Sequence, residues 1–187
     1  SCGSKDQKKH WITLEGNTQG TTFQINYYDS LERDFSSSVD SIYRLVDDNF
    51  STYVQTSIIS NFNNNERDTI FLDSLPLWND LWIKTQKVKN QSGSYFDPYI
   101  KPLVNFWGFG EKSFAKQGDV SINSIDSILE FKNQMITTSK YITKRDPRCM
   151  IDLNAIAQGY TVDLVCDFLD QKGISRYMVE IGGELRC

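Results

Sequence analysis

The first strongly patterned stretch of the chain alternates apolar and polar positions. The segments 11–14 (WITL) and 21–27 (TTFQINY) both have the pattern of strands, and the second keeps a period of two. Gly16 and Asn17 lie between them, and these residue types are common in tight turns. We therefore predict a β-hairpin that turns at Gly16-Asn17.

Two later stretches, 31–49 and 76–89, carry apolar residues at intervals of three and four, which is the spacing of one helical face. The predicted helices run over 31–49, 76–89 and 154–172. Ser30 suits the N-cap of the first helix, because its hydroxyl can accept an unpaired backbone N–H. Gly173 suits the end of the third helix, because glycine readily adopts the left-handed conformation that closes a helix.

The segments between these helices are predicted to be irregular or short. Ser, Thr and Asn fill the loop 51–65, and two prolines with two glycines argue against regular structure over 95–110. A short helix is expected at 124–131, and strands are expected at 141–143, 149–153 and 177–181. Helices mixed with antiparallel strands predict an α+β fold.

Composition and charge narrow the class of protein. Apolar residues make up 39% of the 187 positions and charged residues 24%, as in a globular domain with a sizeable core. The net charge is −4 with scattered Lys and Arg, so no basic stripe supports nucleic-acid binding. No apolar run approaches the roughly 20 residues of a transmembrane helix. The single histidine, His10, and four cysteines without zinc spacing exclude a multi-His metal site within this chain.

The residues 1–10 form a polar tether ahead of one domain that covers 11–187. A cysteine that follows a small residue is typical of the mature start of a bacterial lipoprotein. Cys2 is therefore a candidate lipidation site, with Ser1 as the last signal-peptide residue. This interpretation predicts a lipid-anchored protein of the bacterial cell envelope that faces the periplasm. An ordinary cysteine in a frayed terminus is the alternative.

Two segments have the residue types of a ligand site. At 152–160 a predicted strand delivers Asp152 and a helix begins at Asn154, and the free N–H groups of a helix N-terminus favour an anion. Capping of the helix by Asn154 is the alternative. The loop 95–110 offers aromatic rings that stack on planar ligands and glycines that allow close backbone contact. A loop that fills the core is the alternative there.

Two further segments are glycine-rich or polar. The paired glycines of 182–184 (GGE) indicate a positive φ or close packing, and a tight turn is the alternative. The loop 51–63 carries hydroxyls and amides that suit a phosphate or a ribose, and a solvated loop is the alternative. Its polar side chains include those of Ser51, Thr52, Ser57, Asn61 and Asn63.

In this order and at these spacings, the segments resemble the ApbE family of FAD:protein FMN transferases. The matching stretches are QGTTF at 19–23, FSTY at 50–53, NFN at 61–63, YFDP at 95–98, WGFG at 107–110, DLNAIAQGYTVD at 152–163 and GGE at 182–184. The stretches within 95–110 and 152–163 are the most specific. The resemblance implies an ApbE-like, T-fold-related α+β domain with a mixed antiparallel sheet and packed helices.

The resemblance also implies an activity. FAD is the substrate, Mg²⁺ bridges its pyrophosphate, a Thr or Ser hydroxyl of an acceptor flavoprotein attacks the FMN phosphorus, and AMP leaves. Such a transfer depends on positioning and charge neutralisation. The alternatives are hydrolysis of FAD to FMN and AMP, and a non-catalytic surface flavin-binding lipoprotein. Tyr53 favours transfer, because hydrolytic relatives carry a smaller polar residue at that place.

Site residues follow from the same resemblance. The residues expected to contact FAD are Gln19, Tyr53, Tyr95, Phe96, Asp97, Asp152 and Gln158. The backbone carbonyl of Ala155 is expected to be one Mg²⁺ ligand, and no side chain is assigned as catalytic. Gln19 stands where the family often has Met, and Gln158 replaces a common Lys or Glu. Family members are about twice as long, so we expect the C-terminal half, with the other Mg²⁺ ligands, to be missing. These 187 residues alone are then expected to lack transferase activity.

Overall fold

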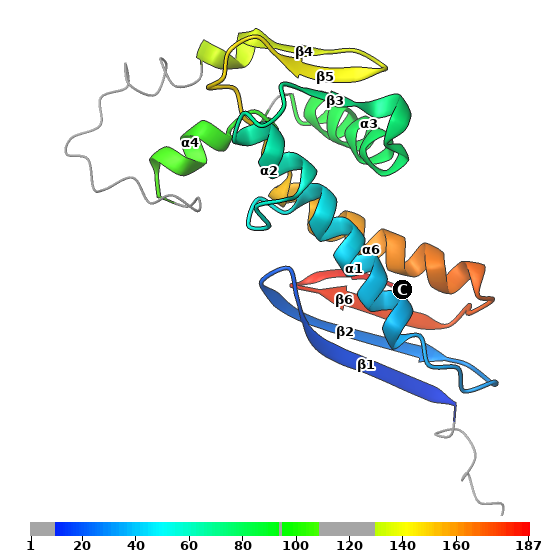
Figure 1. Cartoon of the computed structure of the whole chain (residues 1–187). Helices are drawn as coiled ribbons and strands as arrows, with labels where there is room; N and C mark the ends of the chain where they lie inside the picture. The colour runs from blue at the N-terminus through cyan, green and yellow to red at the C-terminus, as the bar shows by residue number, and fades with distance from the viewer. Residues whose placement is uncertain (1–9, 94, 109–129) are drawn as a thin grey trace, which may run out of the picture. The chain divides into compact units, whose positions relative to one another are not determined.

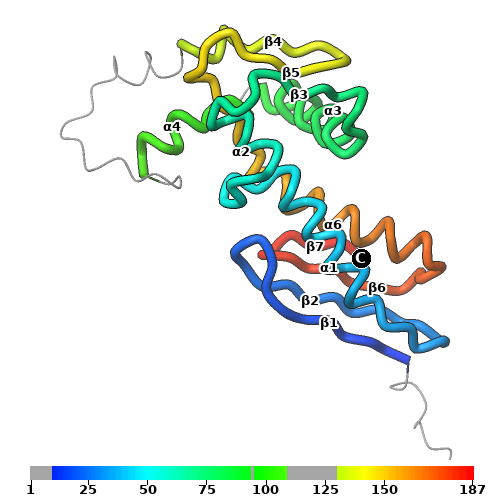
Figure 2. The backbone as a smooth tube through the Cα atoms, viewed as in Figure 1, coloured from blue at the N-terminus to red at the C-terminus, as the bar shows by residue number. Residues whose placement is uncertain are grey.

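The computed structural model describes residues 10–93, 95–108 and 130–187 (Figure 1; Figure 2). These residues divide into two compact units: 10–47 together with 156–187, and the described part of 48–155. Each unit has its own antiparallel sheet together with helices, which confirms the predicted α+β class. Within the described ranges, no helix has the length and apolar character needed to cross a membrane.

The first unit is built on a four-stranded antiparallel sheet. Its strands are β1 (Trp11–Thr18), β2 (Thr21–Tyr28), β6 (Tyr177–Ile181) and β7 (Glu184–Arg186), in the order β1-β2-β6-β7. The helices α1 (Ser36–Phe50) and α6 (Asn154–Gln171) lie on the same face of this sheet (Figure 1). Alternate strand residues such as Ile25 and Val179 are fully buried and share one core with Val39 and Val165 of the helices.

The predicted hairpin of β1 and β2 is confirmed, but its turn lies elsewhere. Gly16 and Asn17 are strand residues, and the chain turns at Gln19-Gly20, both with positive φ. A Cβ at Gly16 would lie 2.9 Å from the ring of its cross-strand partner Phe23. Gly16 therefore serves close packing in the sheet, and the positive φ that the turn requires falls three and four residues later, at Gln19 and Gly20.

The first predicted helix starts later than expected. Ser30 is not an N-cap, because α1 begins at Ser36. Asp29 holds the intervening segment in a turn: its carboxylate accepts the backbone N–H of Leu31 and of Arg33, each at 3.1 Å. The Arg33 guanidinium adds a bond of 2.7 Å to the same carboxylate. These local bonds compete with the helix and delay its start.

The third predicted helix and the last predicted strand are confirmed as α6 and β6. Gly173 follows α6 with a φ of 78°, as expected for a glycine that ends a helix. The paired glycines Gly182 and Gly183, at φ values of 58° and 98°, form the tight turn between β6 and β7. β7 was not predicted, because three residues carry no readable alternation.

The second unit combines short helices with a three-stranded sheet. Its elements are α2 (Ile58–Asn63), β3 (Thr69–Phe71), η1 (Leu72–Ser74), α3 (Pro76–Gln91), α4 (Lys101–Phe106), η2 (Phe131–Gln134), β4 (Met135–Thr137) and β5 (Tyr141–Lys144). The strands pair antiparallel in the order β3-β5-β4. The predicted helix 76–89 and the predicted strand 141–143 are confirmed as α3 and β5. Trp78, Leu81 and Trp82 of α3 supply much of this unit's buried surface.

Two segments predicted to be irregular contain helices. The loop 51–65 includes α2, whose N-cap Ser57 accepts the backbone N–H of Ser60 at 3.0 Å. The segment 95–110 includes α4, which begins just after Ile100. Both helices have six residues, which is too short for a helical period to stand out from the sequence.

The predicted strand 149–153 is wrong. This segment has no strand partner, and its backbone groups bond to a side chain and to a loop carbonyl, as described below. The predicted helix 124–131 lies mostly outside the described residues, and its last residue, Phe131, begins η2. The predicted tether lies outside them too, except for His10.

Candidate functional site

A side-chain clamp in the second unit fixes the segment that leads into α6. Asn63, at the end of α2, donates from Nδ2 to the Ile151 carbonyl at 2.8 Å, and its Oδ1 accepts the Ile151 N–H at 2.8 Å. Asn63 and Ile151 are both buried, so water does not compete for these bonds. Asn63 therefore uses its amide on the backbone, whereas the sequence placed it among residues suited to a phosphate or a ribose.

Lys144 of β5 holds the same segment from another element. Its ammonium donates to the carbonyls of Phe62 and Cys149, and it lies 4.5 Å from the centre of the Phe62 ring. Burial lowers the pKa of Lys144, because the charged ammonium has left water. The two carbonyls and the ring partly replace the lost hydration. The stretch from Cys149 to Ile151 is thus tied to α2 at two places.

The clamped segment delivers the buried carboxylate of Asp152 to the start of α6. Its Oδ1 accepts the backbone N–H of Asn154 at 2.9 Å, and its own N–H donates to the Pro98 carbonyl at 2.8 Å. Asp152 therefore supplies the side-chain oxygen at this helix start, and Asn154, predicted as N-cap, is itself the first helical residue. The second oxygen, Oδ2, is buried and has no hydrogen-bond partner among the described residues.

A charge that no sequence motif identified lies close to that oxygen. Lys101 Nζ lies 3.6 Å from Asp152 Oδ2, beyond hydrogen-bond distance but well within reach of a Coulomb attraction. The side chains of both residues are less than 10% exposed. The only sequence signal for Lys101 is that a charged residue interrupts an apolar stretch, between Ile100 and Pro102. A buried ammonium opposite a predicted ligand-contacting carboxylate is therefore part of this site.

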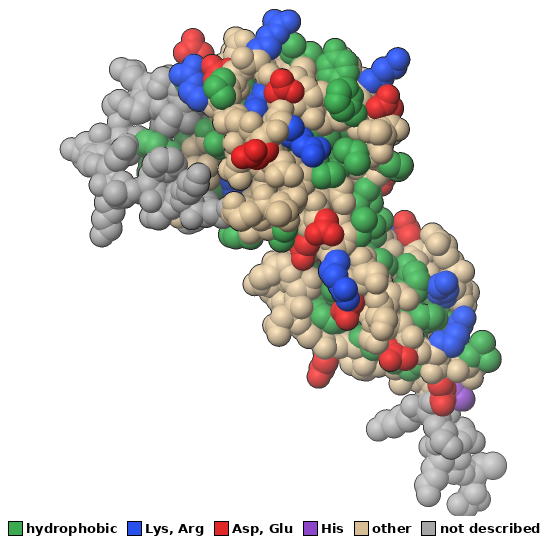
Figure 3. All heavy atoms as spheres, in the orientation of Figure 1, with side chains coloured by type: hydrophobic (Ala, Val, Ile, Leu, Met, Phe, Trp, Pro, Cys, Tyr) green, Lys and Arg blue, Asp and Glu red, His purple; other side chains and the backbone are tan. Residues whose placement is uncertain are grey.

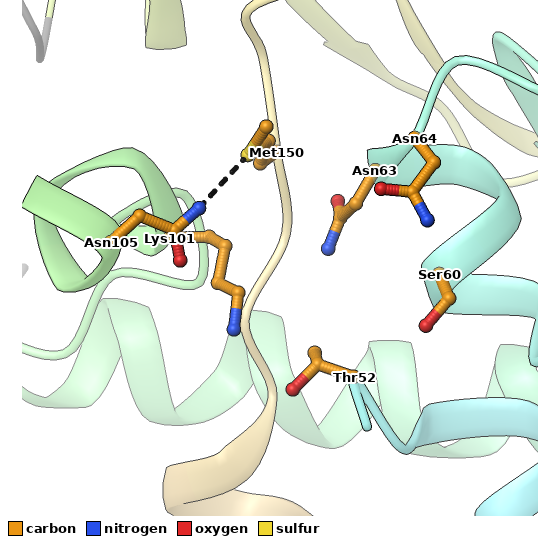
Figure 4. Close-up of a pocket in the computed structure, with 7 residues that line it drawn as sticks. All are labelled: Thr52, Ser60, Asn63, Asn64, Lys101, Asn105 and Met150. Carbon is orange, nitrogen blue, oxygen red and sulfur yellow. Dashed lines mark hydrogen bonds between the residues drawn. The ribbon is translucent and has the colours of Figure 1, made fainter. Parts of the chain in front are cut away.

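A small cavity of about 50 Å³ opens beside Lys101 (Figure 4). Its lining residues are Thr52, Ser60, Asn63, Asn64, Lys101, Asn105 and Met150. This is space for roughly four water molecules or one compact polar group. In Figure 4 the Lys101 ammonium and the Thr52 hydroxyl point toward one another. Thr52 is 2% exposed, and its hydroxyl has no hydrogen-bond partner in the described part of the chain.

The other hydroxyls of the loop 51–63 mostly bind the loop itself. The hydroxyls of Ser57 and Ser60 both donate to the Ser51 carbonyl, at 2.6 and 3.2 Å. Ser51 Oγ in turn accepts the backbone N–H of Tyr53 at 3.3 Å. This internal network leaves Thr52 as the hydroxyl that faces the cavity without a partner.

The aromatic residues predicted to contact FAD differ in exposure. Tyr53 is 66% exposed and Tyr95 is 97% exposed, whereas Phe96 is half-buried. Asp97 is engaged by two ammonium groups, Lys89 Nζ at 3.0 Å and Lys132 Nζ at 3.6 Å. The two tyrosine rings are thus accessible to a planar ligand, while Asp97 is held by local ion pairs.

The remaining predicted FAD contacts, Gln19 and Gln158, belong to the first unit. Gln19 lies in the β1-β2 turn with a φ of 50°, and its Nε2 donates to Thr161 Oγ1 at 2.8 Å. Gln158 lies on α6, one helical turn before Thr161. Its Nε2 is next to Gly182: a Cβ added at that glycine would lie 2.8 Å from it. Gln19, in the β1-β2 turn, thus contacts α6, and Gln158, on α6, lies next to the β6-β7 turn.

Ala155 as a metal ligand and Cys2 as a lipidation site both stay predictions. Ala155 is an exposed residue in the first turn of α6, so solvent reaches it. Among the described residues, no three His, Cys, Asp or Glu side chains gather into a metal site. The described residues therefore do not complete a Mg²⁺ site around the Ala155 carbonyl. Cys2 lies outside the described residues.

Comparison with known proteins supports the resemblance along almost the whole chain. The ApbE family matches residues 19–187. The FAD:protein FMN transferase of Vibrio cholerae is 31% identical over 183 residues, covering 94% of this chain and 54% of that protein. The FAD:protein FMN transferase of Haemophilus influenzae is 29% identical over 192 residues, with the same two shares. The chain spans about half the length of the curated relatives it matches.

Solved structures agree with these sequence relatives. The flavin transferase ApbE from Vibrio cholerae superposes with a TM-score of 0.79 at 28% identity, covering 94% of this chain and 58% of that one. The apo form of the Pseudomonas stutzeri flavinyl transferase ApbE superposes with a TM-score of 0.81 at 26% identity, covering 94% and 60%. The fold and the order of the motifs agree with both comparisons, and the chain belongs to the ApbE family.

Proposed function

We propose that the protein carrying this chain is a Mg²⁺-dependent flavin transferase that moves FMN from FAD onto a Thr or Ser hydroxyl of an acceptor flavoprotein. The hydroxyl oxygen forms a bond to the FMN phosphorus, the bond from that phosphorus to the bridging oxygen breaks so that AMP leaves with this oxygen, and the hydroxyl proton passes to solvent. The observation that carries the proposal is the match to proteins named FAD:protein FMN transferase over 94% of the chain.

The chain's own residues act on binding and orientation in this proposal. Tyr53 and Tyr95 offer exposed rings on which the flavin or the adenine can stack. Asp152 is held in place before any ligand arrives, because its backbone and its Oδ1 are already hydrogen-bonded. A site that is ordered in advance loses little conformational entropy on binding, which favours a transfer that depends on positioning.

Mg²⁺ is part of the proposal through Ala155. The metal, when bound, would neutralise pyrophosphate charge, which favours departure of AMP. Its remaining ligands are proposed to come from the C-terminal half that the family members have beyond the part matched by this chain, which covers 54% of the Vibrio cholerae relative.

One assay separates this function from its two rivals. The full-length protein is incubated with FAD, Mg²⁺ and a candidate acceptor, and the products are resolved by denaturing electrophoresis and chromatography. Flavin fluorescence that stays on the acceptor supports transfer. Free FMN and AMP with no labelled acceptor would show hydrolysis, and unchanged FAD bound to the protein would show a binding protein.

A substitution at Asp152 tests the site. Asp152→Ala is expected to weaken FAD binding at least about 10-fold and to destabilise the fold by about 3–5 kcal/mol, because Lys101 is left buried without its counter-charge. Asp80→Ala, which removes the exposed partner of Lys84, is the matched control and is expected to change neither quantity by more than about 1 kcal/mol. Undiminished FAD affinity in Asp152→Ala would count against the assignment.

A lipid anchor at Cys2 remains our proposal for location, with the domain held at the periplasmic face of the cell envelope. Mass spectrometry of the native N-terminus tests it. A diacylglyceryl mass on Cys2 is the expected result, and an unmodified cysteine in the cytosolic fraction would contradict it.

A further inference from the structure

Two hydrogen-bond donors face the cavity without an acceptor. Lys101 Nζ donates no hydrogen bond to a described residue, and its one described partner is the Asp152 carboxylate at 3.6 Å. Thr52 Oγ1 is buried and has no hydrogen-bond partner in the described part of the chain. Both line the same cavity (Figure 4). Buried polar groups without hydrogen-bond partners are rare in folded proteins, so the Thr52 hydroxyl, next to an ammonium whose one described partner is an ion pair at 3.6 Å, points to a bound group.

The walls of the cavity indicate that this group accepts hydrogen bonds. No carboxylate is among the residues that line it. The amide of Asn63 is already used by Ile151, and Ser60 Oγ donates to a backbone carbonyl. The Lys101 ammonium has three N–H donors and the Thr52 hydroxyl has one O–H donor, and none of these donates a hydrogen bond to a described residue. The complementary ligand atom is therefore an oxygen with free lone pairs.

Charge decides which oxygen fits best. The Asp152 carboxylate lies 3.6 Å from the Lys101 ammonium and is not among the residues that line the cavity, so the positive and negative charges largely cancel at the cavity. A phosphate would bring a further buried negative charge without a net positive field to compensate it. An uncharged oxygen accepts the same hydrogen bonds without that penalty. The volume of about 50 Å³ also suits a single carbonyl or hydroxyl group.

We propose that Lys101 and Thr52 bind an uncharged acceptor oxygen of the substrate, namely a ring carbonyl or a sugar hydroxyl. Asp152 acts on this contact as a positioning residue, since it holds the ammonium in the cavity. The inference rests on the proposed function, because FAD carries both kinds of oxygen, on its flavin half and on its adenosine half. In this proposal the pyrophosphate and Mg²⁺ are bound outside this cavity.

Thr52→Val is the principal test, because it removes the hydroxyl and keeps the shape. Isothermal titration of the full-length protein with FAD is expected to show an affinity about 3- to 10-fold lower than wild type. The melting temperature without ligand is expected to stay equal or rise, since the lost hydroxyl has no partner in the free protein. A merely structural role would lower both. Thr56→Val, on the exposed part of the same loop, is the matched control.

Lys101→Met is the second variant, with an expected loss of FAD affinity of at least about 10-fold. Riboflavin, adenosine and inorganic pyrophosphate are then used as competitors that displace FAD from each protein. A loss of riboflavin affinity places the cavity at the flavin half, and a loss of adenosine affinity places it at the adenosine half; either supports the proposal. Pyrophosphate affinity is expected to change less than about 2-fold.

Two results would overturn the inference. One is an unchanged FAD affinity in Thr52→Val and Lys101→Met while the wild type binds FAD and transfers FMN; the proposed function would then stand without this contact. The other is a loss of pyrophosphate affinity equal to the loss for FAD. A wild-type protein that binds no FAD would instead overturn the proposed function, and this inference with it.

Discussion

Replacement of Asn63 by alanine tests whether one side chain fixes the approach to α6. The change removes both bonds to Ile151 and leaves its buried N–H and carbonyl without partners. An unsatisfied buried polar group costs about 1–3 kcal/mol, so the two together are expected to cost about 2–5 kcal/mol. This is a large share of the roughly 5–15 kcal/mol that stabilises a typical domain.

Urea unfolding measures this loss, with the fluorescence of the buried Trp78 and Trp82 as the signal of the second unit. Asn64→Ala is the matched control, because Asn64 is exposed and adjacent in sequence. Asn63→Asp keeps the acceptor for the Ile151 N–H but places a carboxylate oxygen against its carbonyl, so most of the loss is expected to persist. If Asn63→Ala unfolds within about 0.5 kcal/mol of Asn64→Ala, the clamp does not stabilise the fold as argued.

Two further predictions concern the first unit. The Arg33 guanidinium beside Asp29 lowers the pKa of that carboxyl from 3.8 to about 2, so its contribution to stability is present above the unfolded value and is lost as pH falls toward 2. Asp29→Asn is expected to flatten this part of the acid-unfolding curve, and an unaltered slope would contradict the ion pair. Gly182→Ala is expected to destabilise by about 1–3 kcal/mol, because φ is 58° and the new Cβ would lie 2.8 Å from Gln158 Nε2. Thermal unfolding checks it against Gly183→Ala, which has a positive φ but open space, and equal losses in the two variants would show that backbone strain alone acts.

The elements with a long, clear period were predictable. The β1-β2 hairpin, α3 and β6 appear where the alternation or the helical spacing placed them, and α6 begins at the predicted Asn154 and ends before Gly173. The errors fall on short or locally bonded segments. α2 and α4 have six residues each, and the start of α1 is delayed by the Asp29 turn, which no apolar pattern reveals.

The candidate site was predictable as a set of segments but only partly as a set of contacts. The motif positions identified Asp152, and the structure buries it at the start of α6. The motifs did not identify Lys101 as its partner, and they assigned Asn63 to a ligand although its amide is used on Ile151. These roles depend on contacts across 51 and 88 positions of sequence.

The repeating local structure and the order of the family motifs follow from the amino-acid sequence alone. Strand and helix periods are properties of the chain alone, and the stretch 152–163 could be read without knowing what surrounds it. Only the tertiary structure decided which polar side chains bind the protein and which keep a free donor. Thr52 and Asn63 are both small polar residues of the segment 51–63 and both line the cavity, yet the Asn63 amide binds Ile151 whereas the Thr52 hydroxyl has no partner among the described residues. The physical reason is that hydrogen bonds and burial depend on distances in space, which the spacing of residues along a chain does not contain.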